Sequence, residues 1–195
     1  MPSVRREKRR RRREEEILEA AMRVFETKGY PKATMEDIAE AALLSRVALY
    51  NYFKDKEAIL KALIEQKTSA LKERLDAVPE GDYASTVRAL TQTGVRFQEE
   101  NRGFFRALYT ATGLPEMLRD PRLKANKRAL IEAVARRIAA AQAAGETKPG
   151  KPEELAEYFL NLLFSVTVRD FFEPDEEAGY DPAPIAELFL FGTAR

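Results

Sequence analysis

Apolar residues recur at helical spacing along almost the whole chain, and this periodicity constrains its fold more than any other feature. In the first such segment, Ile17, Ala20, Val24 and Phe25 occupy one face of a helix that should end before Gly29. The strict alternation of apolar and polar residues that marks a half-buried strand is not sustained anywhere in the sequence. The sequence therefore predicts an all-α fold.

Capping residues and helix breakers place the remaining helices. Thr34 and Asp37 have the spacing of a capping box, with Asp in place of Glu, before a short second helix. Ser45 is a suitable N-cap for a third helix through Tyr52, and Asp55 is a suitable N-cap for a long fourth helix. The fourth helix is expected over residues 56–77, and later helices over 83–101, 103–112, 121–144, 152–172 and 182–191.

The absence of two residue types excludes most catalytic and metal-binding chemistry. The chain has no cysteine, which excludes disulfides, thiolate metal sites and thiol nucleophiles, and no histidine, the commonest general base and metal ligand. We therefore expect neither an enzyme nor a bound metal or cofactor. No uncharged apolar stretch of about 18 residues is present, and glutamates follow the basic N-terminus. A cytoplasmic protein without a membrane partner is expected.

The N-terminal segment concentrates the positive charge of the chain. Residues 1–13 contain eight Lys or Arg and one acid, a charge of +7. The whole chain has a net charge of +1, so the remainder carries −6. A basic arm on an otherwise acidic protein favours a polyanionic partner. A solvated, disordered tail is the alternative interpretation.

The third helix carries more polar and aromatic side chains than a short surface helix requires. Residues 1–55 are expected to form three small helices, before a bundle of longer helices in residues 56–195. Leu49 and Phe53 lie four residues apart and can pack inward. The side chains left toward solvent are Arg46, Val47, Ala48, Tyr50 and Asn51. Two short helices joined by a tight turn, the second with such a face, have the layout of a helix-turn-helix.

Side chains on this face suit the recognition of double-stranded DNA. Arg46 can donate two hydrogen bonds to guanine or bind a phosphate, Asn51 can pair with adenine, and Ala48 permits contact with a thymine methyl. Tyrosine hydroxyls, a lysine and the first amides of the second helix can bind phosphate oxygens. The candidate DNA-binding residues are Thr34, Ser45, Arg46, Val47, Ala48, Tyr50, Asn51, Tyr52 and Lys56, with Arg12 and Arg13 of the arm. Alternatively, the tyrosines pack between helices.

One continuous stretch of the sequence resembles a known DNA-binding domain. Residues 17–60, ILEAAMRVFETKGYPKATMEDIAEAALLSRVALYNYFKDKEAIL, are similar to the DNA-binding domain of the TetR family of bacterial transcriptional regulators. The matching residues are Ala20, Ala21, Phe25, Gly29, Tyr30, Thr34, Ile38, Ala39, Ser45, Leu49, Tyr50, Tyr52, Phe53, Lys56 and Glu57. The resemblance implies a dimeric, usually repressive regulator. Residues 1–55 would bind DNA, and residues 56–195 would bind a small-molecule inducer and pair the subunits.

Two positions depart from the family pattern A-G-V-S-x-G-T/A-L/I-Y. The chain has Leu43 in place of the turn glycine, and Val47 in place of the glycine of the recognition helix. A leucine in a left-handed conformation costs about 1 kcal/mol or more, so the turn is either strained or differently shaped. Val47 adds an apolar group to the reading face, which favours contact with a thymine methyl.

The segment 155–172 is apolar nearly all round, which a helix tolerates only if both of its faces are covered. In the family that the chain resembles, the last two helices form a four-helix dimer interface. The resemblance implies a homodimer interface built from Leu155, Phe159, Leu162, Val166, Ile185, Leu188 and Phe189. Burial of this segment within one subunit is the alternative.

Large apolar residues near the middle of the bundle favour a pocket for a largely apolar effector. They are Phe97, Phe104, Phe105, Leu108, Tyr109 and Met117. Asn161, Ser165 and Arg169 follow one another at four-residue steps on one helix stripe and can offer polar groups to the same ligand. The alternatives are ordinary core for the apolar set and interhelical contacts for the polar stripe.

These observations lead to three hypotheses about function. The main one is a ligand-released repressor that binds a near-palindromic operator as a homodimer, with coupling through helix 56–77, the only continuous element expected to join the two parts. Beside a helix-turn-helix, residues 5–13 of the arm are expected to lie along the minor groove or the phosphates, as homeodomain arms do. The alternatives are a sequence-nonspecific nucleic-acid-binding protein that acts through its arm, and a helical small-molecule carrier or enzyme.

Overall fold

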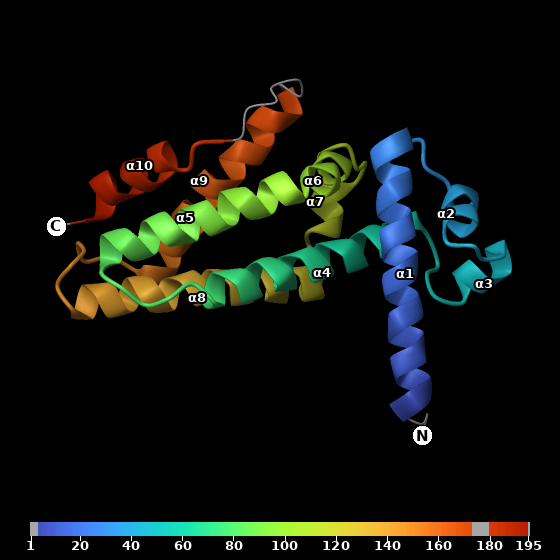
Figure 1. Ribbon diagram of the computed structural model, residues 1–195, viewed down its shortest axis with the longest axis horizontal. Helices are drawn as coiled ribbons and strands as arrows, with labels where there is room; N and C mark the ends of the chain where they lie inside the picture. The colour runs from blue at the N-terminus through green and yellow to red at the C-terminus, as the bar shows by residue number, and fades with distance from the viewer. Residues whose placement is uncertain (1–3, 173–179, 195) are drawn as a thin grey trace. The chain divides into compact units, whose positions relative to one another are not determined.

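A computed structural model of the protein describes residues 4–172 and 180–194, and within these ranges the regular secondary structure is helical (Figure 1). The one β-type pairing in the described ranges is an isolated bridge between Thr147 and Ala194. The expected all-α fold is therefore confirmed. The helices are α1 (Val4–Lys28), α2 (Met35–Ala41), α3 (Arg46–Tyr50), α4 (Lys56–Asp76), α5 (Tyr83–Glu100), α6 (Arg102–Tyr109), α7 (Leu114–Met117), α8 (Pro121–Ala143), α9 (Pro152–Phe172) and α10 (Ala183–Thr193).

Several observed helices differ from the expected ones; α6, for example, ends at Tyr109 instead of residue 112. α1 continues through the basic arm, where Arg10 and Arg11 each form an ion pair with a glutamate one turn away. α3 ends at Tyr50 because the amide of Tyr52 bonds to the carbonyl of Leu49 at 2.9 Å, which tightens the chain into a turn. The short helix α7 was not expected; it follows Gly113, which has a left-handed φ of 77°.

The chain packs as two compact units. Unit 1 comprises Met1–Glu65 and Gly103–Asp120, and unit 2 comprises Gln66–Arg102 and Pro121–Arg195. Packing thus groups α6 and α7 with the N-terminal helices, although the sequence placed them in the second part. The backbone passes between the units within α4, in the first turn of α6 and after α7, so α4 is not the only connection. The assignment of separate functions to residues 1–55 and 56–195 stays a prediction.

Unit 1 is centred on apolar side chains from its first four helices. Ile17 and Phe25 of α1, Ile38 of α2, Leu49 of α3 and Leu60 of α4 are all buried. Burial of each such side chain contributes about 1.5–3 kcal/mol. The helical periodicity that defined these faces in the sequence is therefore confirmed, and it fixes the positions of α2 and α3 against α1.

Unit 2 is centred on α5, α8, α9 and α10. Gly94 of α5 lies against Leu163 of α9, and the buried amide of Gln98 donates a hydrogen bond of 2.9 Å to the carbonyl of Leu163. The rings of Phe159 and Phe189 meet edge to face, with centroids 5.1 Å apart, and join α9 to α10. These contacts determine which faces of α9 and α10 remain exposed.

Candidate nucleic-acid interface

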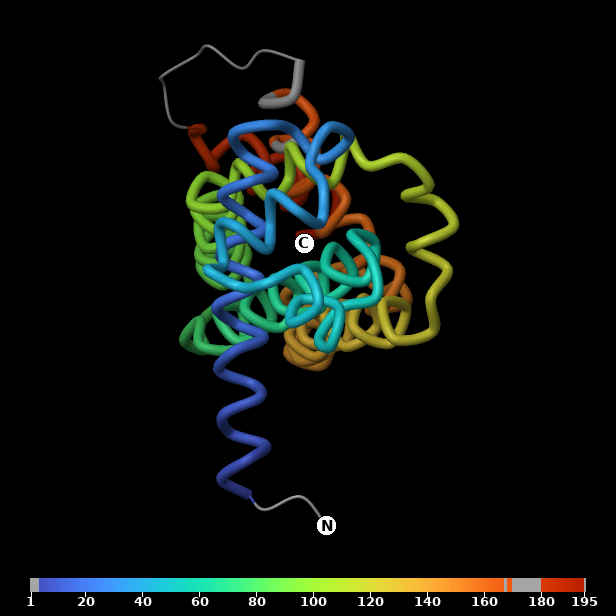
Figure 2. The backbone as a smooth tube through the Cα atoms, turned by 90° about the vertical axis from the view of Figure 1, so that its right-hand side faces the viewer, coloured from blue at the N-terminus to red at the C-terminus, as the bar shows by residue number. Residues whose placement is uncertain are grey.

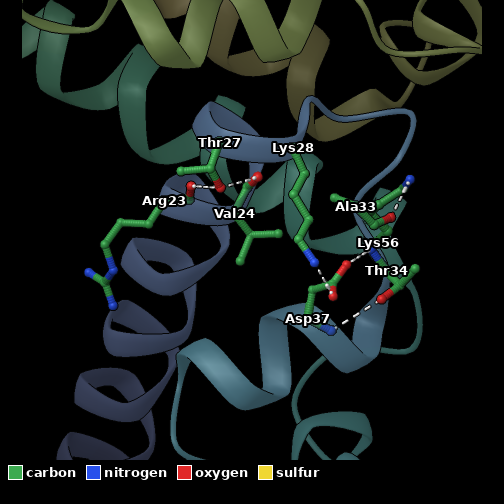
Figure 3. Close-up of polar contacts among 8 residues, drawn as sticks. All are labelled: Arg23, Val24, Thr27, Lys28, Ala33, Thr34, Asp37 and Lys56. Carbon is green, nitrogen blue, oxygen red and sulfur yellow. Dashed lines mark hydrogen bonds and ion pairs between the residues drawn. The ribbon is translucent and has the colours of Figure 1, made fainter.

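A capping network fixes the start of α2 to the end of α1 (Figure 3). The Thr34 hydroxyl accepts a hydrogen bond of 3.1 Å from the amide of Asp37, whose carboxylate accepts one of 3.0 Å from the amide of Thr34. Lys28 Nζ donates to the same carboxylate at 2.6 Å. The hydrogen bond from Lys28, followed by those from Thr34, lowers the pKa of Asp37 to about 2. The predicted capping box is confirmed, and the Thr34 amide, already bonded, is not available to a phosphate.

The turn between α2 and α3 contains a left-handed residue where the family has glycine. Leu43 has a φ of 54°. The amide of Leu44 bonds to the carbonyl of Ala39 at 2.8 Å, and the amide of Leu43 bonds to the carbonyl of Glu40 at 3.0 Å. This pair of bonds is a Schellman motif. The Leu43 side chain is 90% exposed, so no buried contact offsets the cost of about 1–2 kcal/mol for this conformation.

Helix α3 is capped on one side and anchored on the other, which leaves a face toward solvent. Ser45 Oγ accepts a hydrogen bond of 3.2 Å from the amide of Ala48, which confirms the predicted N-cap. Leu49 is fully buried, whereas Val47 is 74% exposed. Of the other predicted DNA-binding residues here, Arg46, Tyr50 and Asn51 are exposed, and Ala48 and Tyr52 are half-buried.

The guanidinium of Arg46 is held by two side chains. Its Nη1 lies 2.6 Å from Oε1 of Glu36, in the first turn of α2. The guanidinium carbon also lies 5.6 Å from the centroid of the Tyr50 ring, one helical turn away. The hydrogen bond with Tyr50, followed by the charge of Glu36, raises the pKa of Arg46. The sequence analysis did not identify Glu36. The available signal was an acidic residue in the first turn of α2, which the helix-turn-helix places near the first turn of α3.

Lys56 has a different role from the one expected. Its ammonium group donates hydrogen bonds to the carbonyl oxygens of Tyr30 at 2.6 Å and Pro31 at 3.3 Å. It also donates one to the carbonyl oxygen of Ala33 at 2.9 Å (Figure 3). It also lies 4.5 Å from the centroid of the Tyr30 ring. An ammonium group has three N–H donors, and all three are used within the protein. We therefore correct the assignment: Lys56 fastens the loop between α1 and α2 to α4 instead of binding phosphate.

The basic arm is helical, which changes its expected contact with DNA. In Figure 2 the N-terminal half of α1 continues as one helix beyond α2 and α3. Arg12 Nε lies 3.3 Å and Arg13 Nη1 lies 2.5 Å from the carboxylate of Glu16. A helix is about 10 Å wide, whereas the minor groove is about 6 Å wide. Of the two contacts expected for the arm, the minor groove or the phosphates, a helical arm therefore favours the phosphates, and this contact stays a prediction.

The residues predicted to bind an effector do not share one compact unit. Phe104, Phe105 and Met117 are buried in unit 1, where Leu108 is half-buried and Tyr109 is exposed, whereas Phe97 is buried in unit 2. The polar stripe of α9 is exposed at Asn161, Ser165 and Arg169. A hollow of about 520 Å³ in unit 2 is lined by Tyr83, Arg137 and Glu146 among others, and by none of these predicted residues.

The residues predicted to form a dimer interface divide between the two faces of their helices. Phe159, Val166 and Phe189 are buried within their own subunit, which is the alternative considered for them, so we correct their assignment. Leu155, Leu162 and Ile185 are half-buried, and Leu188 is 60% exposed. The exposed apolar side chains on these helices include three that the sequence analysis did not name: Tyr158, Val168 and Phe191. For Tyr158 the available signal was its position four residues before Leu162, on the same stripe of α9.

Two features are absent from the described part of the chain. No group of three or more His, Cys, Asp or Glu side chains there is arranged to hold a metal ion. None of the helices there is long and apolar enough to cross a membrane.

The chain is similar to several known proteins. A family model described as bacterial regulatory proteins, tetR family, matches residues 17–63. The chain is 30% identical over 154 residues to the nucleoid occlusion factor SlmA of Actinobacillus pleuropneumoniae, covering 75% of each chain. It is 28% identical over 182 residues to the uncharacterized HTH-type transcriptional regulator YfiR of Bacillus subtilis, covering 90% of this chain and 88% of that one.

A solved structure shows the same fold over most of the chain. The fatty acid degradation regulator FadR from Bacillus halodurans superposes with a TM-score of 0.80 at 16% identity, covering 92% of this chain and 95% of that one. The family match includes the capped α2, the tight turn and the exposed face of α3. The chain belongs to the tetR family of bacterial regulatory proteins and is a DNA-binding transcriptional regulator.

Proposed function

We propose that the protein is a repressor that binds a near-palindromic operator as a homodimer and is released when a small, largely apolar molecule binds. It would act in the cytoplasm and by binding alone, without catalysis. The observation that carries the proposal is the exposed face of α3, where Arg46, Val47 and Asn51 stand beside a capped and bonded turn. A recognition helix needs such a face, because its first residues contact base edges in the major groove.

A second copy of the chain is the partner that best fits the exposed faces of α9 and α10. Phe191 is 88% exposed on α10, and Tyr158 and Val168 are exposed on α9. A two-fold axis brings the same patch of both subunits together, so one set of exposed apolar residues can cover itself. We therefore reassign the exposed stripe Asn161, Ser165 and Arg169 to the proposed interface instead of the effector site.

A two-fold dimer sets the form of the operator. The two α3 helices would read half-sites about 34 Å apart, one turn of DNA, on opposite sides of a pseudo-two-fold axis. The arm would add sequence-independent phosphate contacts to each half-site.

The effector site is proposed around α6 and α7. Phe104, Phe105 and Met117 are buried in unit 1, the unit that also contains α2 and α3. A ligand that separated these apolar side chains would bind inside the unit that holds the recognition helix. Its free energy of binding would then be coupled directly to the conformation that reads DNA.

The test is fluorescence-anisotropy binding of the full chain to DNA fragments that flank its own gene, with scrambled duplexes as competitors at near-physiological salt. Preference for one fragment by about a thousandfold or more would support a specific regulator. Equal and strongly salt-dependent binding to every duplex would contradict it and favour the arm alone.

Deletion of residues 1–13 distinguishes the contribution of the arm to DNA binding from that of the recognition helix. The deletion should weaken binding to the preferred and scrambled duplexes by the same factor and reduce the salt slope by about 0.9 for each phosphate that the arm no longer neutralises. Loss of all DNA binding on this deletion would instead support a sequence-nonspecific protein that acts through its arm.

A further inference from the structure

Glu36 and Arg46 form an ion pair at the point where α2 and α3 begin. Their side chains are 53% and 63% exposed, yet Nη1 and Oε1 lie only 2.6 Å apart. The guanidinium is also held against the Tyr50 ring, at 5.6 Å from its centroid. The Glu36 carboxylate and the Tyr50 ring together restrict the orientations that the Arg46 guanidinium can adopt.

Stability does not explain this arrangement well. Ion pairs between exposed side chains contribute little to folding, because water screens the charges and two long side chains lose rotamer freedom. α2 is already fixed by its capping box and by Lys28, and α3 by its own N-cap and the burial of Leu49. The pair therefore acts mainly on the orientation of Arg46, not on the fold.

The way a helix-turn-helix docks on DNA shows how the orientation of Arg46 would affect its contacts with bases and phosphates. The first helix of the motif crosses the DNA backbone, and the second places its N-terminal residues at base edges. Glu36, in the first turn of α2, would therefore approach the phosphates, which repel a carboxylate. A guanidinium bonded to that carboxylate has part of its charge offset and one N–H group occupied, so it attracts phosphates less, while its remaining N–H groups can still donate to a guanine.

We propose that Glu36 is a positioning residue that directs Arg46 to base edges and so raises the discrimination between operator and other DNA. It lowers affinity for phosphates in general and retains affinity for the matching base pair. This inference rests on the proposed function, because it requires that α3 reads a specific operator.

The experiment compares two single charge removals on α2. A duplex is first enriched from a random-sequence pool by the wild-type protein, and dissociation constants are then measured for it and for a scrambled duplex over a range of salt concentrations. The variants are Glu36→Gln, Arg46→Ala and the double variant. The matched control is Glu40→Gln, which removes an exposed carboxylate of the same helix. Thermal unfolding of each variant confirms that it is folded.

Glu36→Gln should lower the ratio of the two affinities by about two- to fivefold, the effect of one exposed ion pair. It should also steepen the salt dependence on scrambled DNA by about 0.9, because the released Arg46 gains a phosphate. Glu40→Gln should leave the ratio unchanged. With Arg46→Ala already present, Glu36→Gln should no longer change it.

Two results would overturn the inference. One is an equal change in the ratio for Glu36→Gln and Glu40→Gln, which would mean that general charge repulsion is sufficient. The other is an effect of Glu36→Gln that persists with Arg46→Ala, which would mean that Glu36 acts without Arg46. Failure of the wild-type protein to enrich any duplex is a different outcome: it would overturn the proposed operator binding itself and this inference with it.

Discussion

Leu43 shows how main-chain bonds can hold a residue in a conformation that suits glycine. The bonds from the Leu43 and Leu44 amides fix the turn, and the exposed leucine side chain contributes little to it. From the sequence this turn could be either strained or differently shaped, because Leu43 stands where the family has glycine. The sequence could not predict that the turn keeps the usual shape and accepts the strain.

Replacement of this residue should stabilise the protein. Leu43→Gly removes the left-handed penalty of about 1–2 kcal/mol but increases the entropy of the unfolded chain, so we expect a net gain of about 0.5–1 kcal/mol. Urea unfolding followed by circular dichroism measures this change. Leu43→Ala is the control, because alanine keeps most of the penalty. Equal stability of the glycine and alanine variants would show that the turn is not strained.

Asp37 gives the start of α2 a dependence on pH. Its pKa falls from an ordinary value of 3.8 to about 2, so the folded state prefers the ionised carboxylate. The contribution of Asp37 is therefore fully present above pH 3.8 and is lost as the pH falls from 3.8 toward 2. Asp37→Asn should be less stable than the wild type at neutral pH, and the difference should shrink in this acid range.

Thermal unfolding at a series of pH values from 6 to about 2 measures that difference, and working with the difference between variants removes the shared effect of other carboxylates. Glu40→Gln, which removes an exposed carboxylate of α2, is the control and should show no such convergence. A gap between wild type and Asp37→Asn that stays constant down to pH 2 would contradict the role of the Lys28 hydrogen bond.

At the scale of single elements, local signals predicted three capped helix starts but not the inward face of α9. Thr34, Ser45 and Asp55 were predicted as N-caps, and each accepts a hydrogen bond from an amide three residues later. Such caps depend only on neighbouring residues. The inward face of α9 was not predicted, because a helix that is apolar nearly all round has no polar stripe to mark its outer side.

The helical arm was missed for a different reason. Its charge was interpreted as a binding tail, although Arg10 and Glu14 already have the four-residue spacing that stabilises a helix, and they form a 2.9 Å ion pair. The arm sequence therefore has both the charge of a binding tail and the residue spacing of a helix. Only the structure shows that the arm and α1 are one element.

The contact between α5 and α9 should not tolerate an added methyl group. A Cβ at Gly94 would lie 2.7 Å from Cδ1 and 3.1 Å from Cδ2 of Leu163, which is itself buried. Gly94→Ala should therefore destabilise the protein by about 1–3 kcal/mol, even though alanine favours a helix. Chemical denaturation measures the loss, and Leu163→Val in the same chain should recover part of it. A stabilising Gly94→Ala would mean that α9 moves aside freely.

At the scale of the whole molecule, the exposed apolar side chains of α9 and α10 predict that two copies of the chain pair through these helices. Phe191→Asp places a charge where the proposed two-fold interface buries an aromatic ring, so the dimer should weaken by at least about tenfold. Sedimentation velocity across a range of protein concentrations measures this. Leu118→Asp, at an exposed apolar residue of unit 1, is the control. Unchanged association of the Phe191 variant would place the interface elsewhere.

The organisation of the molecule could be predicted only in part. The order of helices and the capped helix-turn-helix follow from periodicity and caps, which are local. The reassignment of Lys56 and the pairing of Arg46 with Glu36 depend on which carbonyl and carboxylate groups the fold brings near them. The grouping of α6 and α7 with the N-terminal helices depends on packing between segments far apart in the sequence.

Because α1 is continuous, the DNA contacts of the arm depend on the direction of its basic side chains around the helix axis as well as on their charge. An α-helix turns by about 100° for each residue, so one residue inserted after Arg13 would rotate every basic side chain of the arm around the axis of α1. The number of charges would stay the same, but a different side of the arm would meet the DNA. In a flexible tail such an insertion would not change how the basic side chains meet the DNA. In a rigid helical arm it changes the direction in which they point.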